Sequence, residues 1–240
     1  MELHIAKNID KLSIAVADWL VQYAAEVLLQ QDRFTIALSG GSTPKLLHEL
    51  LASDAYKNKF DWQKWHVFFG DERFVPFADE RNNAKMAFDT LLNHVPIPAD
   101  HVHIMQTEHI SPEDSAVAYE KLLHQYFDGA ETSFDLVLLG MGDDGHTLSL
   151  FPGSPVVHEA HAWATSLWLP SQDMFRVTLT HAIVNHAAAV AFLAAGSKKT
   201  TVLKEVLNGD YNPDVYPSQI IQPLQGQLHW FVDEAAAAEL

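Results

Sequence analysis

One segment of the chain combines glycines with carboxylates and a histidine: LLGMGDDGHTLSLFPG, residues 138–153. Gly140, Gly142 and Gly145 match the G-x-G-x-x-G pattern of dinucleotide-binding turns. Such a turn opens a long helix whose N-terminus faces the pyrophosphate, whereas Pro152 leaves room here for little more than one helical turn. The two aspartates inside the loop would also repel a pyrophosphate. We therefore interpret the glycine pattern as coincidental.

The same loop supports an acid–base interpretation. Asp144 and His146 follow an apolar run that is predicted to be a strand, so both lie at a strand end. A carboxylate beside an imidazole fixes the imidazole tautomer, and a histidine held in this way can act as a general base near neutral pH. A structural role is the alternative for any single histidine, but the glycines and aspartates around His146 favour a functional one.

A second glycine-containing loop, LSGGSTP at residues 38–44, lies between a predicted strand and a predicted helix. Gly40 and Gly41 allow the backbone to approach a ligand, and Ser42 and Thr43 place hydroxyl groups beside the free N–H groups of the helix start. This combination is typical of an anion site. The Walker pattern G-x-x-x-x-G-K-[ST] is not matched. The alternative is an ordinary tight turn with a Ser/Thr cap.

The segment GDERFVP, residues 70–76, concentrates charge after another apolar run. The charged residues are Asp71, Glu72 and Arg73, which would also suit a solvated turn. Ligands of open α/β sheets bind beyond the carboxyl ends of the strands, so the position of these residues favours a functional role.

Three further basic residues are candidates for contacts with an anionic ligand. Arg176 opens a predicted strand, and Lys198 and Lys199 follow Gly196 at the predicted start of a helix. A lysine at a helix N-terminus opposes the helix dipole, so a bound anion would justify it. The alternative is a solvated surface charge.

The histidine pairs of the chain give weak metal signals. HEAH at 158–161 does not match the H-E-x-x-H zinc motif, and HVH at 101–103 has no evident third ligand. The chain contains no cysteine, which excludes thiolate metal sites and a cysteine nucleophile. It also lacks a G-x-S-x-G serine elbow. We expect no metal site.

The loops that carry these glycines, hydroxyl groups and charged residues must be positioned by alternating strands and helices. Helical spacing and helix-start signals predict helices at 9–31, 43–53, 82–95, 111–127 and 198–209. Strands are predicted at 33–40, 65–72, 134–140, 161–169, 176–181, 187–196 and the start of 227–240, where a short terminal helix follows. Continuous apolar strands indicate burial on both faces of a sheet. The pattern predicts one domain, 1–240, of the α/β class, with a mainly parallel, Rossmann-like sheet flanked by helices.

The overall composition narrows the class of ligand. The chain has 240 residues, 15 Lys and Arg, 48% hydrophobic residues and a formal net charge of −16. We therefore expect a globular protein that binds neither nucleic acid nor an anionic membrane. A phosphorylated substrate would need a local basic site inside this negative field. We expect no signal peptide, no apolar run approaching the roughly 20 residues that span a bilayer, and a cytoplasmic location.

Taken together, the motifs resemble those of the 6-phosphogluconolactonases. That family's order is followed by LSGGSTP, GDERFVP, Asn83, GMGDDGHTLSLFPG, RVTLT and GSKK, and its tail is similar to the closing LHWFVDEAAAAEL. The resemblance covers essentially the whole chain. It implies hydrolysis of 6-phospho-D-glucono-1,5-lactone to 6-phosphogluconate in the pentose phosphate pathway. It also implies a fold similar to that of glucosamine-6-phosphate deaminase, and neither a metal nor an organic cofactor.

The resemblance further implies roles for individual residues. His146 is expected to activate water, with Asp144 as its partner and Arg73 near the sugar or the developing oxyanion. The family usually has Ser-Asn where this chain has Asn82 and Asn83, so only Asn83 is carried over. The expected phosphate or substrate contacts are Gly41, Ser42, Thr43, Asn83, Arg176 and, by the family's G-x-x-K spacing, Lys199.

Two alternatives remain, a deaminase or isomerase on the same fold and a non-catalytic sugar-phosphate sensor. The deaminases continue from their Asp-Gly-His turn into Asn-Glu-Pro, where this chain has Leu150, Phe151 and Pro152. They also have Asp-Glu-Tyr where this chain ends in Arg73. Losing a carboxylate and gaining an arginine suits ester hydrolysis, because deamination needs extra acid–base groups. We expect a monomer or small homo-oligomer that binds a small sugar-phosphate lactone.

Overall fold

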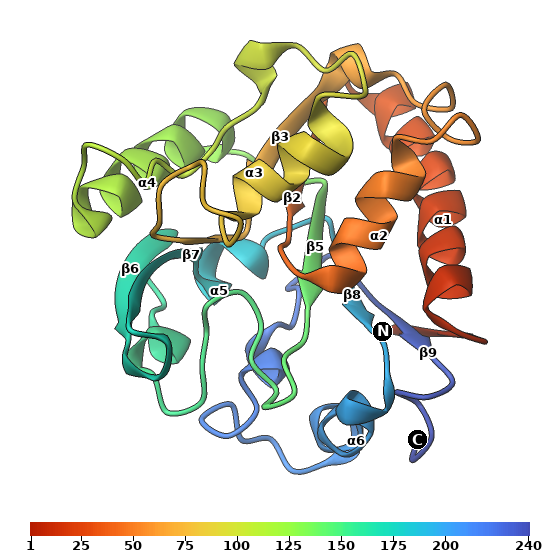
Figure 1. The fold of residues 1–240 in the computed structure, drawn as a ribbon, viewed down its shortest axis with the longest axis vertical. Coiled ribbons are helices and arrows are strands. Elements are labelled where there is room, and N and C mark those ends of the chain that lie inside the picture. The colour runs from red at the N-terminus through yellow and green to blue at the C-terminus, as the bar shows by residue number, and fades with distance from the viewer.

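Figure 1 shows the fold of residues 1–240, all of which the computed structural model describes. The strands are β1 (Glu2–Ala6), β2 (Phe34–Leu38), β3 (Trp65–Phe69), β4 (Asp71–Arg73), β5 (Leu136–Gly140), β6 (Ala164–Leu169), β7 (Met174–Leu179), β8 (Ala189–Ala194) and β9 (Gln227–Asp233). The α-helices are α1 (Ile9–Gln30), α2 (Ser42–Leu51), α3 (Asn83–Ala87), α4 (Pro112–Phe127), α5 (His181–Val184) and α6 (Thr200–Asn208).

The main sheet has six strands in the order β1-β9-β8-β5-β2-β3. All neighbouring strands are parallel; Ile36 of β2 lies opposite Leu136 of β5, and Leu138 of β5 lies opposite Ala191 of β8. Parallel strands require crossover connections, which here include α1, α2, α4 and α6. The expected α/β fold with a mainly parallel sheet is confirmed.

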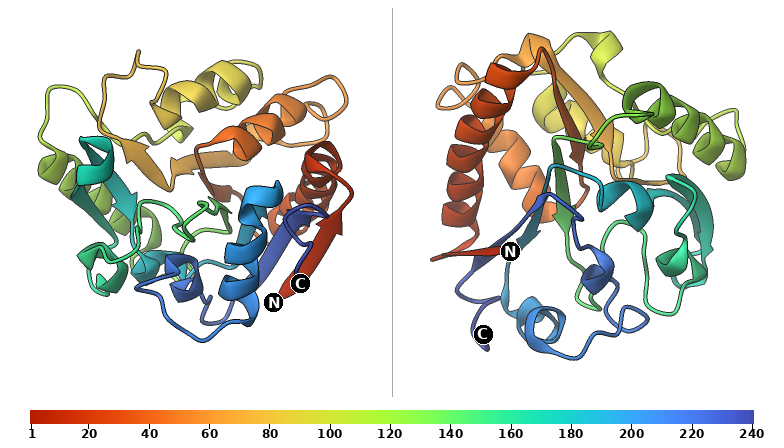
Figure 2. Two further views of the ribbon diagram at one scale, coloured as in Figure 1. Left: turned by 60° about the horizontal axis from the view of Figure 1, so that its bottom comes forward. Right: turned by 180° about the vertical axis from the view of Figure 1, so that it is seen from behind.

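Alternate residues of the central strands build two cores on opposite faces of this sheet. In β5, Val137 and Leu139 belong to one core, Leu136 and Leu138 belong to the other, and all four side chains are buried. The first core includes residues of α4 and β7, and the second includes residues of α1 and α2. The views in Figure 2 show these helices on opposite sides of the sheet. Burial on both faces explains why the strands read as unbroken apolar runs.

Helix α1 packs along one face of the sheet. Its buried residues include Leu12, Val16 and Leu20, whose spacing of four residues places them on one side of the helix. By length and composition alone, α1 is long and apolar enough to cross a membrane, so the expectation that no segment approaches that length is wrong. The helix passes this test because the charged residues among its 22 residues are few.

A second sheet, the antiparallel β4-β7-β6, is not predicted by the sequence. The predicted strand 65–72 divides at Gly70, because β3 stays in the main sheet while β4 leaves it to pair with β7. Gly70 donates its N–H to Leu38 O and accepts the N–H of Leu179, so one residue is bonded to both sheets. A Cβ at Gly70 would lie 2.7 Å from Leu148 Cδ2, which explains the glycine at this junction.

The other differences between the predicted and the observed elements lie near the ends of the chain or at the end of a predicted helix. The sequence does not predict β1, a mostly exposed edge strand. The predicted helix 82–95 is α-helical only as far as Ala87 and continues as a π-helical turn, Phe88–Leu92. The predicted terminal helix is wrong, because residues 234–239 form turns. That segment is too short for a stable helical nucleus, and Asp233 accepts the N–H of Ala236 through its side chain.

Candidate active site

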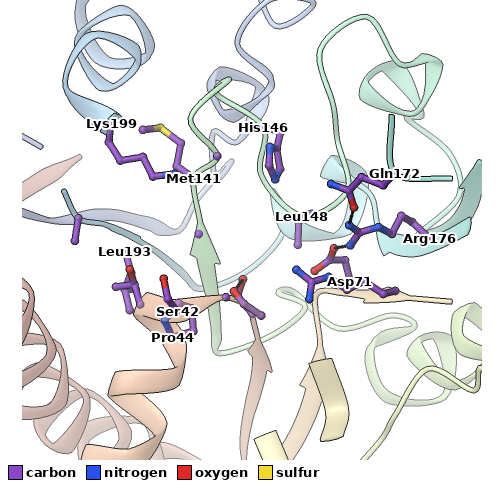
Figure 3. Close-up of a pocket in the computed structure, with 18 residues that line it drawn as sticks. Ser42, Pro44, Asp71, Met141, His146, Leu148, Gln172, Arg176, Leu193 and Lys199 are labelled. Carbon is purple, nitrogen blue, oxygen red and sulfur yellow. Dashed lines mark hydrogen bonds and ion pairs between the residues drawn. The ribbon is translucent and has the colours of Figure 1, made fainter. Parts of the chain in front are cut away.

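Three of the loops singled out in the sequence meet at one cavity of about 290 Å³, called here the strand-end hollow (Figure 3). It lies beyond the carboxyl ends of β2, β5 and β8, the edge at which open α/β sheets bind ligands. Charged side chains from β4 and β7 complete its wall. Among the predicted site residues, those that line it are Gly41, Ser42, Thr43, Arg73, His146, Arg176 and Lys199.

His146 and Asp144 make the contact expected of a base and its orienting carboxylate. Asp144 Oδ1 lies 2.5 Å from His146 Nδ1, and it also accepts the backbone N–H of His146 at 3.1 Å. Burial alone would raise the pKa of Asp144, but the hydrogen bonds and charge of His146 outweigh it and hold this pKa below its ordinary value. An ionised Asp144 favours the proton on Nδ1 and leaves Nε2 as an acceptor. The imidazole points into the hollow (Figure 3).

The glycines of this loop make room for the histidine and do not form a dinucleotide-binding turn. A Cβ at Gly142 would lie 2.1 Å from His146 Nδ1, so only glycine lets the imidazole fold back over the loop. Gly142 N–H donates to His146 O at 2.8 Å and closes the turn. Gly145 has a φ of +80° and packs against Tyr216. No long helix follows; the next helical element is the 3-10 turn Pro155–His158.

The segment after His146 is anchored to both sheets. Thr147 Oγ1 donates to Gly140 O at 2.8 Å, and Ser149 Oγ donates to Asp71 Oδ2 at 2.6 Å. Leu148 between them has a φ of +53°, an unusual left-handed conformation for a branched residue. These anchors fix the position from which the loop presents its imidazole. Sequence reasoning did not single out Ser149, whose partner lies 78 residues away.

The loop between β2 and α2 has the geometry of an anion site. Gly41 precedes α2 with a φ of +106°. As a glycine it has no side chain to cap the first N–H groups of the helix. Ser42 and Thr43 begin the helix, and Pro44 lies in its first turn as expected. The first N–H groups of an α-helix have no partner inside the helix, so they are available to an anion in the hollow.

The second sheet supplies the two arginines of the hollow. Arg73 of β4 and Arg176 of β7 are directly paired in the antiparallel register. Arg176 is only 4% exposed, lies 3.6 Å from Asp71 Oδ2 through Nη1, and donates from Nη2 to Gln172. The Nε atoms of both arginines are buried and have no hydrogen-bond partner. Gln172 is a site residue that sequence reasoning missed, since nothing in its local pattern marks it.

Lys199 lies across the hollow from Arg176 (Figure 3). Its Nζ is 2.5 Å from Asp143 Oδ1, and its side chain is 19% exposed. Lys198 is exposed and does not line the hollow. Of the two adjacent lysines, the structure therefore places the one selected by the G-x-x-K spacing at the site.

Asn83 lies behind the loop between β2 and α2 rather than in the strand-end hollow. The residue is 2% exposed, and its side chain donates from Nδ2 to Asp71 O at 2.8 Å. A Cβ at Gly40 would lie 1.9 Å from Asn83 Oδ1, so Gly40 makes room for this amide. With Asn82, it lines a neighbouring cavity of about 510 Å³ that shares Gly41, Ser42 and Arg73 with the hollow. Contact of Asn83 with a substrate stays a prediction.

The start of α3 explains two other residues of the motifs. Asn82 caps the helix by accepting the N–H of Lys85 at 2.8 Å, a role that serine fills equally well. Glu72 is fully buried and accepts the backbone N–H groups of Arg73, Asn83 and Ala84. Burial raises the pKa of Glu72 to about 7, and these three donors oppose the rise. Glu72 thus holds β4 to α3 and does not line the hollow.

The other histidine motifs lie outside the hollow. His103 Nε2 is 2.8 Å from the Tyr126 hydroxyl, and His101 Nδ1 is 3.2 Å from Trp65 O. His158 Nε2 is 2.7 Å from Asp214 Oδ1 on the surface. Each of these three rings therefore has a protein partner.

These features define an α/β protein with an imidazole–carboxylate pair and several basic groups around one hollow. A model of the family described as glucosamine-6-phosphate isomerases/6-phosphogluconolactonase matches residues 7–230. The chain is 43% identical over 215 residues to a 6-phosphogluconolactonase of Nostoc sp., covering 88% of this chain and 86% of that relative. The chain belongs to the glucosamine-6-phosphate isomerase/6-phosphogluconolactonase family.

Solved structures show the same fold. A 6-phosphogluconolactonase from Trypanosoma cruzi aligns with a TM-score of 0.85 at 30% identity, covering 100% of this chain and 96% of that chain. A monomeric glucosamine-6-phosphate deaminase aligns with a TM-score of 0.83 at 19% identity, covering 99% of each chain. The expected similarity to the deaminase fold is confirmed.

Proposed function

We propose that this chain hydrolyses 6-phospho-D-glucono-1,5-lactone to 6-phosphogluconate, with His146 as the general base. The observation that carries the proposal is the 2.5 Å contact between His146 Nδ1 and Asp144 Oδ1 at the edge of a hollow with basic walls. The relative that shares 43% identity is named a 6-phosphogluconolactonase, which supports the choice of substrate.

The chemistry requires one base and a site for negative charge. His146 Nε2 accepts a proton from water while the water oxygen bonds to C1 of the lactone, and the carbonyl oxygen becomes an oxyanion. The C1–O5 bond then breaks, and the proton held on His146 passes to O5. The product acid ionises in solvent. Asp144 stabilises the transient imidazolium, because its lowered pKa keeps it ionised.

The positive groups around the hollow have two tasks. The first turn of α2 offers the N–H groups of Ser42 and Thr43 to a phosphate, and Arg176 and Lys199 flank the hollow from opposite sides. A phosphate held there orients C1 toward the imidazole. Arg73 enters from β4 and supplies positive charge for the sugar or the oxyanion.

The residue at position 151 supports hydrolysis over deamination. The ring of Phe151 lies 4.3 Å from the His146 ring, so an aromatic group fills the place next to the imidazole. Deaminases of similar sequence have a glutamate at this point, which completes a relay with their histidine. In this chain, the carboxylate bonded to the imidazole is Asp144, on the Nδ1 side.

The test is a coupled assay in which glucose-6-phosphate dehydrogenase generates the lactone and spontaneous hydrolysis is subtracted. His146→Ala should lower turnover by about 10²–10⁴-fold, the usual contribution of a general base. His158→Ala is a matched control, because His158 also contacts an aspartate but lies outside the hollow. Near-normal turnover by a folded His146→Ala variant would contradict the assignment.

Two further results would favour the alternatives. Release of ammonia from glucosamine 6-phosphate at a rate comparable with lactone hydrolysis would indicate a deaminase. Binding of 6-phosphogluconate without turnover of the lactone would indicate a sugar-phosphate sensor. We expect neither result.

A further inference from the structure

A cluster of one glutamate and two histidines lies at the edge of the main sheet, away from the strand-end hollow. Glu2 and His4 belong to β1, and His229 lies opposite Glu2 on the neighbouring strand β9. Residues two apart on a strand share a face, so Glu2 and His4 point the same way. The ring of Trp19 from α1 packs at 4.9 Å from that of His229, which places the cluster on the α1 side of the sheet.

We propose that Glu2, His4 and His229 form a binding site for one divalent transition-metal ion, for which Zn²⁺ is the probe. One donor atom from each residue lies within 4.8 Å of the other two. Two imidazoles and one carboxylate are a common ligand set for Zn²⁺, which keeps an open position for water beside three protein ligands. Glu2 is exposed, so solvent can reach the fourth position.

The distances fit an ion between the donors. His4 Nε2 is 3.2 Å from His229 Nδ1, and Glu2 Oε2 is 3.6 Å from His229 Nδ1 and 3.8 Å from His4 Nε2. With metal–ligand lengths of about 2.0–2.2 Å, one ion reaches all three donors at angles of roughly 100°, 120° and 130°. The two distances from Glu2 are too long for direct hydrogen bonds. The carboxylate is thus spaced for an intervening ion.

The surroundings orient both imidazoles. His229 Nε2 lies 3.0 Å from Gln227 Oε1, so Nε2–H donates to the amide and the Nδ1 lone pair faces His4 and Glu2. Such an outer partner fixes the tautomer of most metal-binding histidines. The His4 ring stacks on Phe231 at 4.3 Å.

The position of the site predicts its effect. A bound ion would tie the edge strand β1 to β9. Glu2 and His229 lie near the starts of their strands, whereas the strand-end hollow lies beyond the carboxyl ends of β2, β5 and β8. The ion should therefore stabilise the fold and leave lactone hydrolysis unchanged.

Calorimetric titration with Zn²⁺ tests the proposal on the full chain after treatment with EDTA and dialysis. The wild type should bind one ion, and His4→Gln or Glu2→Gln should weaken binding by at least about tenfold, the lower end of losses seen even for outer-shell changes. Zn²⁺ should raise the thermal unfolding temperature of the wild type but not of His4→Gln. The control His158→Gln removes a surface histidine that pairs with Asp214, and its affinity should equal that of the wild type.

Other patterns would overturn the proposal. Equal Zn²⁺ affinity in the wild type and His4→Gln would show that the cluster is not the site. Loss of binding in His158→Gln would place the ion at the surface pair, and loss in His146→Ala would place it in the strand-end hollow. Gln227→Leu gives an independent readout, because it should weaken binding by about 10–100-fold if it orients His229.

Discussion

Replacing Gly142 by alanine measures how strictly catalysis depends on the placement of the base. A Cβ at this position would lie 2.1 Å from His146 Nδ1 and 2.5 Å from Asp144 Oδ1. Cβ atoms in proteins essentially never approach another heavy atom closer than 3.0 Å. The imidazole must therefore move by about 1 Å, a displacement that can lower a rate by about 10²-fold.

The expected loss is in kcat rather than in folding. The backbone at Gly142 is outside the left-handed region, and the clash is with side chains that can move, so the thermal unfolding temperature should change little. Gly140→Ala is the matched control within the same motif, because its Cβ would meet nothing closer than Ser39 Oγ at 3.8 Å. It should keep most of the activity.

The coupled lactone assay, with spontaneous hydrolysis subtracted, gives kcat for each variant. If Gly142→Ala acts by separating His146 from Asp144, then adding Asp144→Asn should cost little more than the larger single change. A folded Gly142→Ala enzyme with wild-type kcat would refute the reasoning. Full additivity of the two changes would show that the clash acts elsewhere.

Two other outcomes are expected. Lys199→Ala should weaken binding of 6-phosphogluconate in calorimetry while Lys198→Ala should not, because only Lys199 lines the hollow; equal affinities would contradict this role. Burial raises the pKa of Glu72 from 4.5 to about 7, so its contribution to stability is complete below pH 4.5 and is lost as the pH rises through about 7. Denaturant unfolding should therefore show a flatter pH dependence for Glu72→Gln than for the wild type across that interval, and parallel curves would contradict the shift.

Arg176 illustrates a limit on substitution experiments. A change to alanine would remove a positive charge from the hollow, but it would also leave Asp71 without its cationic partner in a buried position. Loss of one member of a buried ion pair destabilises a fold. A loss of ligand binding can therefore be attributed to the missing positive charge more directly in Lys199→Ala than in Arg176→Ala.

The main sheet was predictable because its strands are buried on both faces. Apolar runs such as 134–140 need no information from distant residues to be recognised. β1 carries no such run, since this edge strand is mostly exposed. The second sheet depends on the division of a strand at Gly70 and on pairing between Arg73 and Arg176. That pairing joins segments about a hundred residues apart, which local patterns do not report.

The candidate site was likewise predictable only where local sequence determines it. Its place was predictable, because the motifs at 38–44, 70–76 and 138–153 each follow a strand of one parallel sheet and the carboxyl ends of such strands share an edge. The contact of His146 with Asp144 was also predictable, since the residues lie two apart in one turn. The supports of Arg176 were not, because Gln172 and Asp71 reach it only through the folded second sheet. The burial of Asn83 likewise follows from the tertiary fit against Gly40.

The direct pairing of Arg73 and Arg176 has a consequence for how chains of this family can vary in length. A single inserted or deleted residue in β4 or β7 would turn one arginine to the opposite face of the antiparallel sheet, because side chains alternate with a period of two. Insertions outside these two strands leave this register unchanged. An alignment of active relatives should therefore show no gaps within 71–73 or 174–179.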